Sequence, residues 1–66
     1  MRIKYGKLIK EARKARGWTQ QALAQRAKLA RPMITLMETE AVEPKLSTLA
    51  RVARALDVPI GELVQL

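Results

Sequence analysis

Apolar residues recur at helical spacing along most of the chain, and no stretch alternates as a half-buried strand would. Near the N-terminus the apolar positions keep the i, i+3, i+4 spacing of an amphipathic helix: Leu8, Ile9, Ala12 and Ala15. Gly17 follows, as glycine often does just after the end of a helix. The pattern predicts a first helix over about residues 3–16 of an all-α protein.

Two short helices are predicted next. Thr19 can cap the first of them with its hydroxyl, and the apolar stripe of this helix ends near Lys28. The second begins between Ala30 and Pro32. At about 100° per residue, its side chains divide into a core-facing and a solvent-facing group. The core-facing group is Met33, Ile34 and Met37, and the solvent-facing group is Arg31, Pro32, Thr35 and Leu36.

A fourth helix is predicted over residues 46–56. The side chains expected to face inward are Leu46, Leu49, Val52, Ala53 and Leu56. Pro59 breaks the pattern because proline disfavours helix at the preceding residue. A last short helix is expected from Ile60 to about Val64. The whole pattern predicts a single compact five-helix domain over residues 1–66.

Composition excludes several kinds of chemistry. Cysteine and histidine are absent, so disulfides, thiolate metal sites, zinc sites and histidine acid–base catalysis are excluded. We expect no enzyme activity, no cofactor and no small-molecule substrate. No apolar run approaches the roughly 20 residues of a membrane span, and no signal-peptide core follows the N-terminus. A soluble cytoplasmic protein is the expectation.

The charge is strongly basic and unevenly spread. Lys and Arg number 13 against 6 Asp and Glu, which gives a net charge of +7. The first 16 residues hold seven bases and one acid, whereas residues 37–66 hold three bases and five acids. A basic first half indicates a polyanionic partner, and the alternative is charge that only keeps the protein soluble. A membrane surface is disfavoured, because the first helix must bury its apolar stripe in the core.

Two short helices joined by about three residues, the second with a solvent-facing side, have the geometry of a helix-turn-helix over residues 19–38. The first helix of such a pair crosses the DNA backbone, and the second lies in the major groove.

Three segments carry a family signature. Residues 17–24 read GWTQQALA, residues 34–38 read ITLME and residues 44–49 read PKLSTL. In this order and spacing they resemble the G-x-T-Q-x-x-L-A, I-S-x-x-E and P-x-L-x-T-L segments of the lambda-repressor-like helix-turn-helix family, of the Cro/phage-repressor or XRE type. The resemblance implies a regulator of transcription that binds double-stranded DNA sequence-specifically, a dimeric repressor with its third helix in the major groove. It would act in the cytoplasm, on the nucleoid if the source is a bacterium or phage.

The resemblance also implies residue roles. Thr19 and Gln20 match the family's helix cap and phosphate-contacting glutamine, and a helix N-terminus does attract phosphate. Further phosphate contacts are expected from Lys28, Lys45 and Ser47. The family's base-reading positions fall on Arg31, Pro32, Thr35 and Leu36. Arg13 and Glu38 match a pair that ties the first helix to the recognition helix, and we expect a partly buried salt bridge between them.

Departures from the family pattern keep alternatives open. Ala30 replaces the usual hydroxyl cap, and Pro32 favours a start of the recognition helix one residue later, with Arg31 as its cap. Glu40 stands where the family often has glycine. Pro32 and Leu36 could contact thymine methyl groups or a protein partner. The alternatives are a protein-interaction module on the same fold, such as an antitoxin or a transcriptional bridging factor, or an engineered or truncated domain with little DNA binding.

The C-terminal segment holds more apolar side chains than one short helix buries. They are Val58, Ile60, Leu63, Val64 and Leu66. We expect the excess to form the interface of a homodimer. The alternative is that all five cover the core of the monomer.

Overall fold

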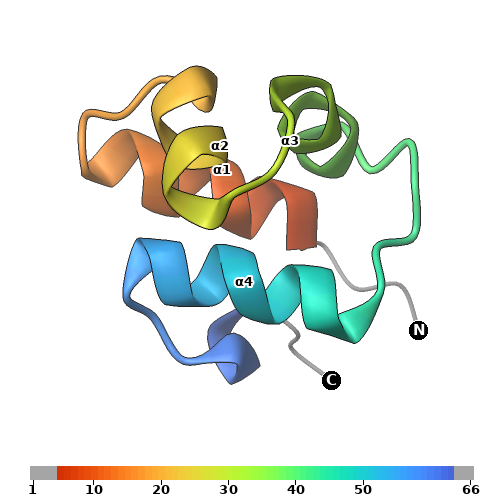
Figure 1. Ribbon diagram of the computed structural model, residues 1–66. Helices are drawn as coiled ribbons and strands as arrows, with labels where there is room; N and C mark the ends of the chain where they lie inside the picture. The colour runs from red at the N-terminus through yellow and green to blue at the C-terminus, as the bar shows by residue number, and fades with distance from the viewer. Residues whose placement is uncertain (1–4, 64–66) are drawn as a thin grey trace.

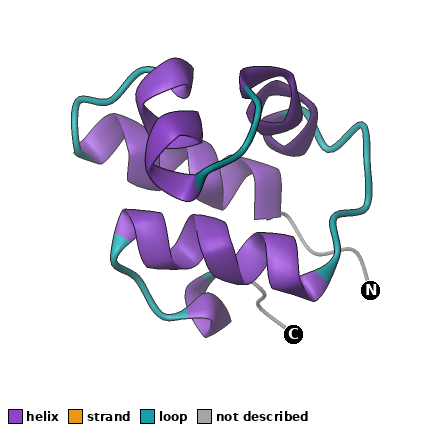
Figure 2. Ribbon diagram, viewed as in Figure 1, coloured by secondary structure: helices purple, strands orange, loops and turns teal. Residues whose placement is uncertain are grey.

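Four α-helices and one turn of 3-10 helix form the part of the chain that the computed structural model describes, residues 5–63 (Figure 1). Within these residues no strand forms, in agreement with the all-α prediction (Figure 2). The elements are α1 (Tyr5–Ala15), α2 (Gln20–Ala27), α3 (Arg31–Glu38), α4 (Leu46–Leu56) and η1 (Ile60–Glu62). None of these helices is long and apolar enough to cross a membrane.

Helix ends follow the local signals in the sequence. Gly17 has a φ of 69° just after α1, a conformation that glycine adopts at little cost. Thr19 caps α2, because its Oγ1 accepts a hydrogen bond of 3.0 Å from the Ala22 amide. Lys28 and Asp57 end α2 and α4 in the left-handed conformation, each with a φ of 58°. Both helices therefore end with a residue other than the glycine that usually takes this conformation.

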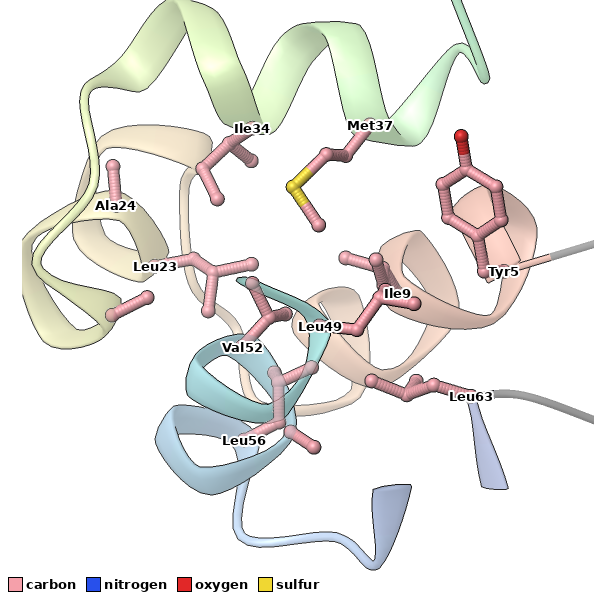
Figure 3. Close-up of a cluster of buried hydrophobic side chains, with 12 residues drawn as sticks. Tyr5, Ile9, Leu23, Ala24, Ile34, Met37, Leu49, Val52, Leu56 and Leu63 are labelled. Carbon is pink, nitrogen blue, oxygen red and sulfur yellow. The ribbon is translucent and has the colours of Figure 1, made fainter. Parts of the chain in front are cut away.

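One apolar core joins all five elements (Figure 3). Its most deeply buried side chains come from the four α-helices and from the residue that follows η1: Ile9, Leu23, Ile34, Met37, Val52, Leu56 and Leu63. In Figure 3, Ile34 and Met37 point from α3 down towards Leu23 and Ile9. The inward face of α3 that the helical projection predicts is therefore the face that packs, and its other face stays exposed.

Two side chains predicted to face inward are exposed. Leu46 has 66% of its surface accessible because it is the first residue of α4, and helical side chains tilt towards the N-terminus and so past the end of the core. Ala15 is also exposed. The buried stripe of α1 runs through Tyr5, Ile9 and Arg13, which turns the helix so that Ala15 faces solvent.

The fifth predicted helix is only the 3-10 turn η1. Gly61 lies within this turn, and glycine disfavours a continued α-helix. The predicted ends at Ile3 and Val64 lie outside the described residues. The structure thus describes four α-helices and a turn where the sequence pattern predicts five helices.

Candidate nucleic-acid interface

The helix-turn-helix geometry is present as α2, a connection of three residues and α3 (Figure 2). The left-handed Lys28 turns the chain, and its amide donates back to the carbonyl oxygens of Ala24 and Gln25. Arg51 of α4 donates from Nη2 to the Lys28 carbonyl oxygen at 3.2 Å. The turn that sets the angle between α2 and α3 is therefore held by hydrogen bonds from both α2 and α4.

The outer face of α3 consists of the four side chains predicted for it. Arg31, Pro32, Thr35 and Leu36 are exposed. Leu36 has 39% of its surface accessible, which is high for a leucine. The helix begins at Arg31 with Ala30 as its cap, so the expected later start with Arg31 as the cap is wrong. Proline is tolerated anywhere in the first turn because the amides there lack intrahelical partners, and this allows Pro32 to be the second helical residue.

Arg13 and Glu38 form a buried ion pair between α1 and α3. The Arg13 Nε and Nη2 donate to the two carboxylate oxygens at 2.6 and 3.0 Å, and the side chains are only 10% and 2% exposed. The third donor, Nη1, binds the Trp18 carbonyl oxygen at 2.7 Å. This fork-to-fork pairing fixes α3 on α1 and also holds the segment that leads into α2.

Gln20 joins the same network from the start of α2. Its Nε2 donates to Glu38 Oε1 at 3.1 Å, and its Oε1 accepts from the Thr35 hydroxyl at 2.9 Å. These contacts use one of the two amide N–H donors, so an additional bond to phosphate is compatible with them. The phosphate role of Gln20 stays a prediction, and its contact with Thr35 was missed by the sequence analysis.

The other residues predicted to contact phosphate lie at three helix ends. Thr19 caps α2, Lys28 ends α2, Lys45 caps α4 and Ser47 lies in the first turn of α4. All four residues are exposed. No side chain caps the N-terminus of α4, so its first amides have no side-chain partner there. Cations and helix N-termini suit phosphate binding, and the phosphate contacts of these four residues stay predictions.

Gly6 and Glu40 support α3 in ways that the sequence analysis missed. An added Cβ at Gly6 would lie 2.6 Å from the Met37 carbonyl oxygen and 2.7 Å from that of Glu38, so α1 touches the end of α3 directly. Glu40 has a φ of 58°, and its Oε2 accepts from the Gly6 amide at 3.0 Å. The sequence signal for this contact was that Glu40 stands where the family often has glycine. Its carboxylate is held against the N-terminus of α1, where a negative charge is favourable.

The two aromatic residues pack against the core. Tyr5 is 9% exposed and its hydroxyl binds the Val42 carbonyl oxygen, which anchors the linker between α3 and α4. Trp18 is half-buried against the core, and the Arg26 guanidinium lies 4.3 Å from its ring centroid. Neither ring belongs to the outer face of α3.

The C-terminal apolar residues divide into three groups. Leu63 is only 2% exposed and packs into the core, so its assignment to a dimer interface is wrong. In Figure 3 its side chain lies beside Ile9 of α1 and Leu56 of α4. Val58 and Ile60 are half-buried against the same core. Val64 and Leu66 lie outside the described residues.

Comparison with known proteins places the chain among helix-turn-helix proteins. The helix-turn-helix family HTH_3 matches residues 9–63. The immunity repressor protein of Bacillus phage phi105 is 41% identical over 59 residues, which are 89% of this chain and 41% of the repressor. The chain therefore spans about two fifths of that curated relative. The crystal structure of the restriction-modification controller protein C.AhdI from Aeromonas hydrophila is 31% identical, with a TM-score of 0.88 over 92% of each chain.

Proposed function

Because this chain belongs to the helix-turn-helix family HTH_3, we propose that it binds double-stranded DNA as a transcriptional regulator, with α3 in the major groove. The observation that carries the proposal is the outer face of α3. Four adjacent side chains are exposed there on a helix that a buried ion pair fixes to the rest of the domain. The likeness to a phage immunity repressor and to a controller protein supports regulation, and we propose repression.

Selection from a randomised duplex pool, followed by gel retardation at increasing salt, tests the proposal. We expect one preferred sequence, and an affinity that falls steeply with salt because the protein displaces counterions from phosphates. The exposed Leu36 favours one alternative, a surface for a protein partner. In that case no sequence is enriched and random duplex is poorly retained at every salt concentration.

Arg31→Ala and Lys45→Ala separate base contacts from phosphate contacts. Arg31 is the best guanine reader on the outer face, because a guanidinium can donate to O6 and N7 together. We expect Arg31→Ala to relax selectivity at one base pair by about 1–3 kcal/mol. Lys45→Ala is expected to weaken selected and random duplexes equally and to reduce the salt slope by about 1. Competition binding measures both effects, and an Arg31→Ala variant that behaves like Lys45→Ala refutes the base-reading role.

Lys28→Gly is expected to raise stability while lowering DNA affinity. Glycine removes the steric cost of the left-handed conformation, a gain of about 0.5–1 kcal/mol, and it keeps the carbonyl that Arg51 binds. The lost ammonium should weaken all duplexes alike. Thermal melting measures the expected rise in stability, and gel retardation measures the expected fall in DNA affinity. In the control Lys7→Gly, inside α1, stability should instead fall by about 1 kcal/mol.

We propose a homodimer as the DNA-binding form. Of the five C-terminal apolar residues predicted for such an interface, Val58 and Ile60 are the described ones that remain partly exposed. A two-fold dimer places its recognition helices about 34 Å apart, one turn of DNA. Sedimentation at high micromolar concentration should give twice the 7.4 kDa mass of the chain. A monomer in the presence and absence of DNA removes the dimer from the proposal.

A further inference from the structure

A chain of four polar side chains leads from the core to the outer face of α3. Arg13 binds Glu38 through two hydrogen bonds, Glu38 accepts from Gln20, and Gln20 accepts from Thr35. The first pair is buried, Gln20 is half-buried and Thr35 is exposed. The buried pair is thus connected by hydrogen bonds to a side chain predicted to read bases.

The direction of each hydrogen bond in this chain is fixed by chemistry. A carboxylate that faces a guanidinium only accepts hydrogen bonds, so Gln20 must present its NH₂ group to Glu38. A planar amide with its nitrogen on one side has its oxygen on the other. Gln20 Oε1 therefore faces Thr35, and it can only accept.

The single hydroxyl proton of Thr35 is consequently directed into the protein. Gln20 Oε1 lies 2.9 Å from Thr35 Oγ1, and the Arg31 carbonyl oxygen lies 3.4 Å from it. Both neighbours are acceptors, and the shorter distance favours Gln20. With its proton held there, the hydroxyl presents only oxygen lone pairs to a ligand at the outer face.

We propose that Thr35 reads DNA as a hydrogen-bond acceptor and selects bases with an exocyclic amino group. In the major groove adenine and cytosine present amino donors, whereas guanine and thymine present the acceptors O6 and O4. Thr35 therefore favours A or C over G or T on the strand that it faces. This inference rests on the proposed function and adds the class of base that one side chain recognises.

Selection from a randomised duplex pool with the parent protein, Thr35→Val and Gln20→Leu tests the proposal. Valine keeps the shape of threonine without the hydroxyl, so the position whose preference disappears is the one that Thr35 reads. We expect the parent to prefer A or C there by about tenfold, the strength of one good base contact. In Gln20→Leu the hydroxyl proton is released from its better acceptor, so G and T should gain at that position while the other positions keep their preferences.

Two control variants separate this role from a general structural one. Thr35→Ser retains the hydroxyl, and Gln21→Leu makes the same change at the exposed neighbour in α2, so both should keep the parent profile. The proposal is overturned if Thr35→Val changes no position, if the lost preference was for G or T, or if Gln20→Leu leaves the profile unaltered. A parent that selects no sequence at all instead overturns the proposed function, and the role of Thr35 with it.

Discussion

Glu38→Ala is expected to unfold much of the protein at room temperature. The substitution leaves the Arg13 guanidinium buried without its carboxylate, and removing one partner of a buried pair costs about 3–5 kcal/mol. Domains are stable by about 0.05–0.15 kcal/mol per residue, so the loss is comparable with the whole stability of a chain of 66 residues. Urea unfolding followed by circular dichroism measures it.

Two further variants locate the cause of this loss. Glu11→Ala removes an exposed acid from α1 and should change stability by less than about 0.5 kcal/mol. The double variant Arg13→Met with Glu38→Leu removes both charges from the buried site and should recover most of the stability lost in Glu38→Ala. If Glu38→Ala and Glu11→Ala unfold at the same urea concentration, the Arg13–Glu38 pair does not have the structural importance described.

Gly6→Ala is expected to destabilise the protein by about 1–3 kcal/mol, because the new methyl group overlaps with backbone atoms. The Met37 and Glu38 carbonyl oxygens would lie 2.6 and 2.7 Å from it, and they can move only if the end of α3 moves. Thermal melting should show a midpoint lower by about 4–8 °C for each kcal/mol in a domain of this size.

Gly61→Ala is the matched control for this substitution. Nothing lies within 4 Å of a Cβ built at Gly61, and this glycine is not among the residues with positive φ. Alanine there should leave stability unchanged or raise it slightly, since it restricts the unfolded chain. A Gly6→Ala protein that melts together with Gly61→Ala shows that α1 does not contact α3 as closely as described.

Much of the fold could be predicted because helical periodicity is local. The division of α3 into a core face with Ile34 and Met37 and an outer face with Thr35 and Leu36 needs only the rotation per residue. The Arg13–Glu38 pair came from the family resemblance, since nothing local connects residues 25 positions apart. Local patterns fail at helix ends, as with Leu46, where a side chain can extend past the core.

The details of the site depend on where separate helices meet. A single sequence does not give the relative placement of its helices. Gly6 looks like any glycine in a helix until α3 is placed against it. Gln20 matched a phosphate-contacting position, and its bond to Thr35 depends on the angle between α2 and α3. Leu63 was assigned to an interface because its partners in the core lie far away in sequence.

Binding to duplexes with single modified guanines tests most directly whether α3 reads the major groove. In the selected sequence, 7-deazaguanine removes the N7 acceptor from the major groove, and inosine removes the N2 amino group from the minor groove. We predict that 7-deazaguanine at the position read by Arg31 weakens parent binding by about 1–3 kcal/mol and that inosine there does not. The Arg31→Ala protein should not discriminate against 7-deazaguanine. Two results contradict recognition through α3 in the major groove. In one, inosine weakens binding and 7-deazaguanine does not; in the other, neither analogue weakens binding at any guanine.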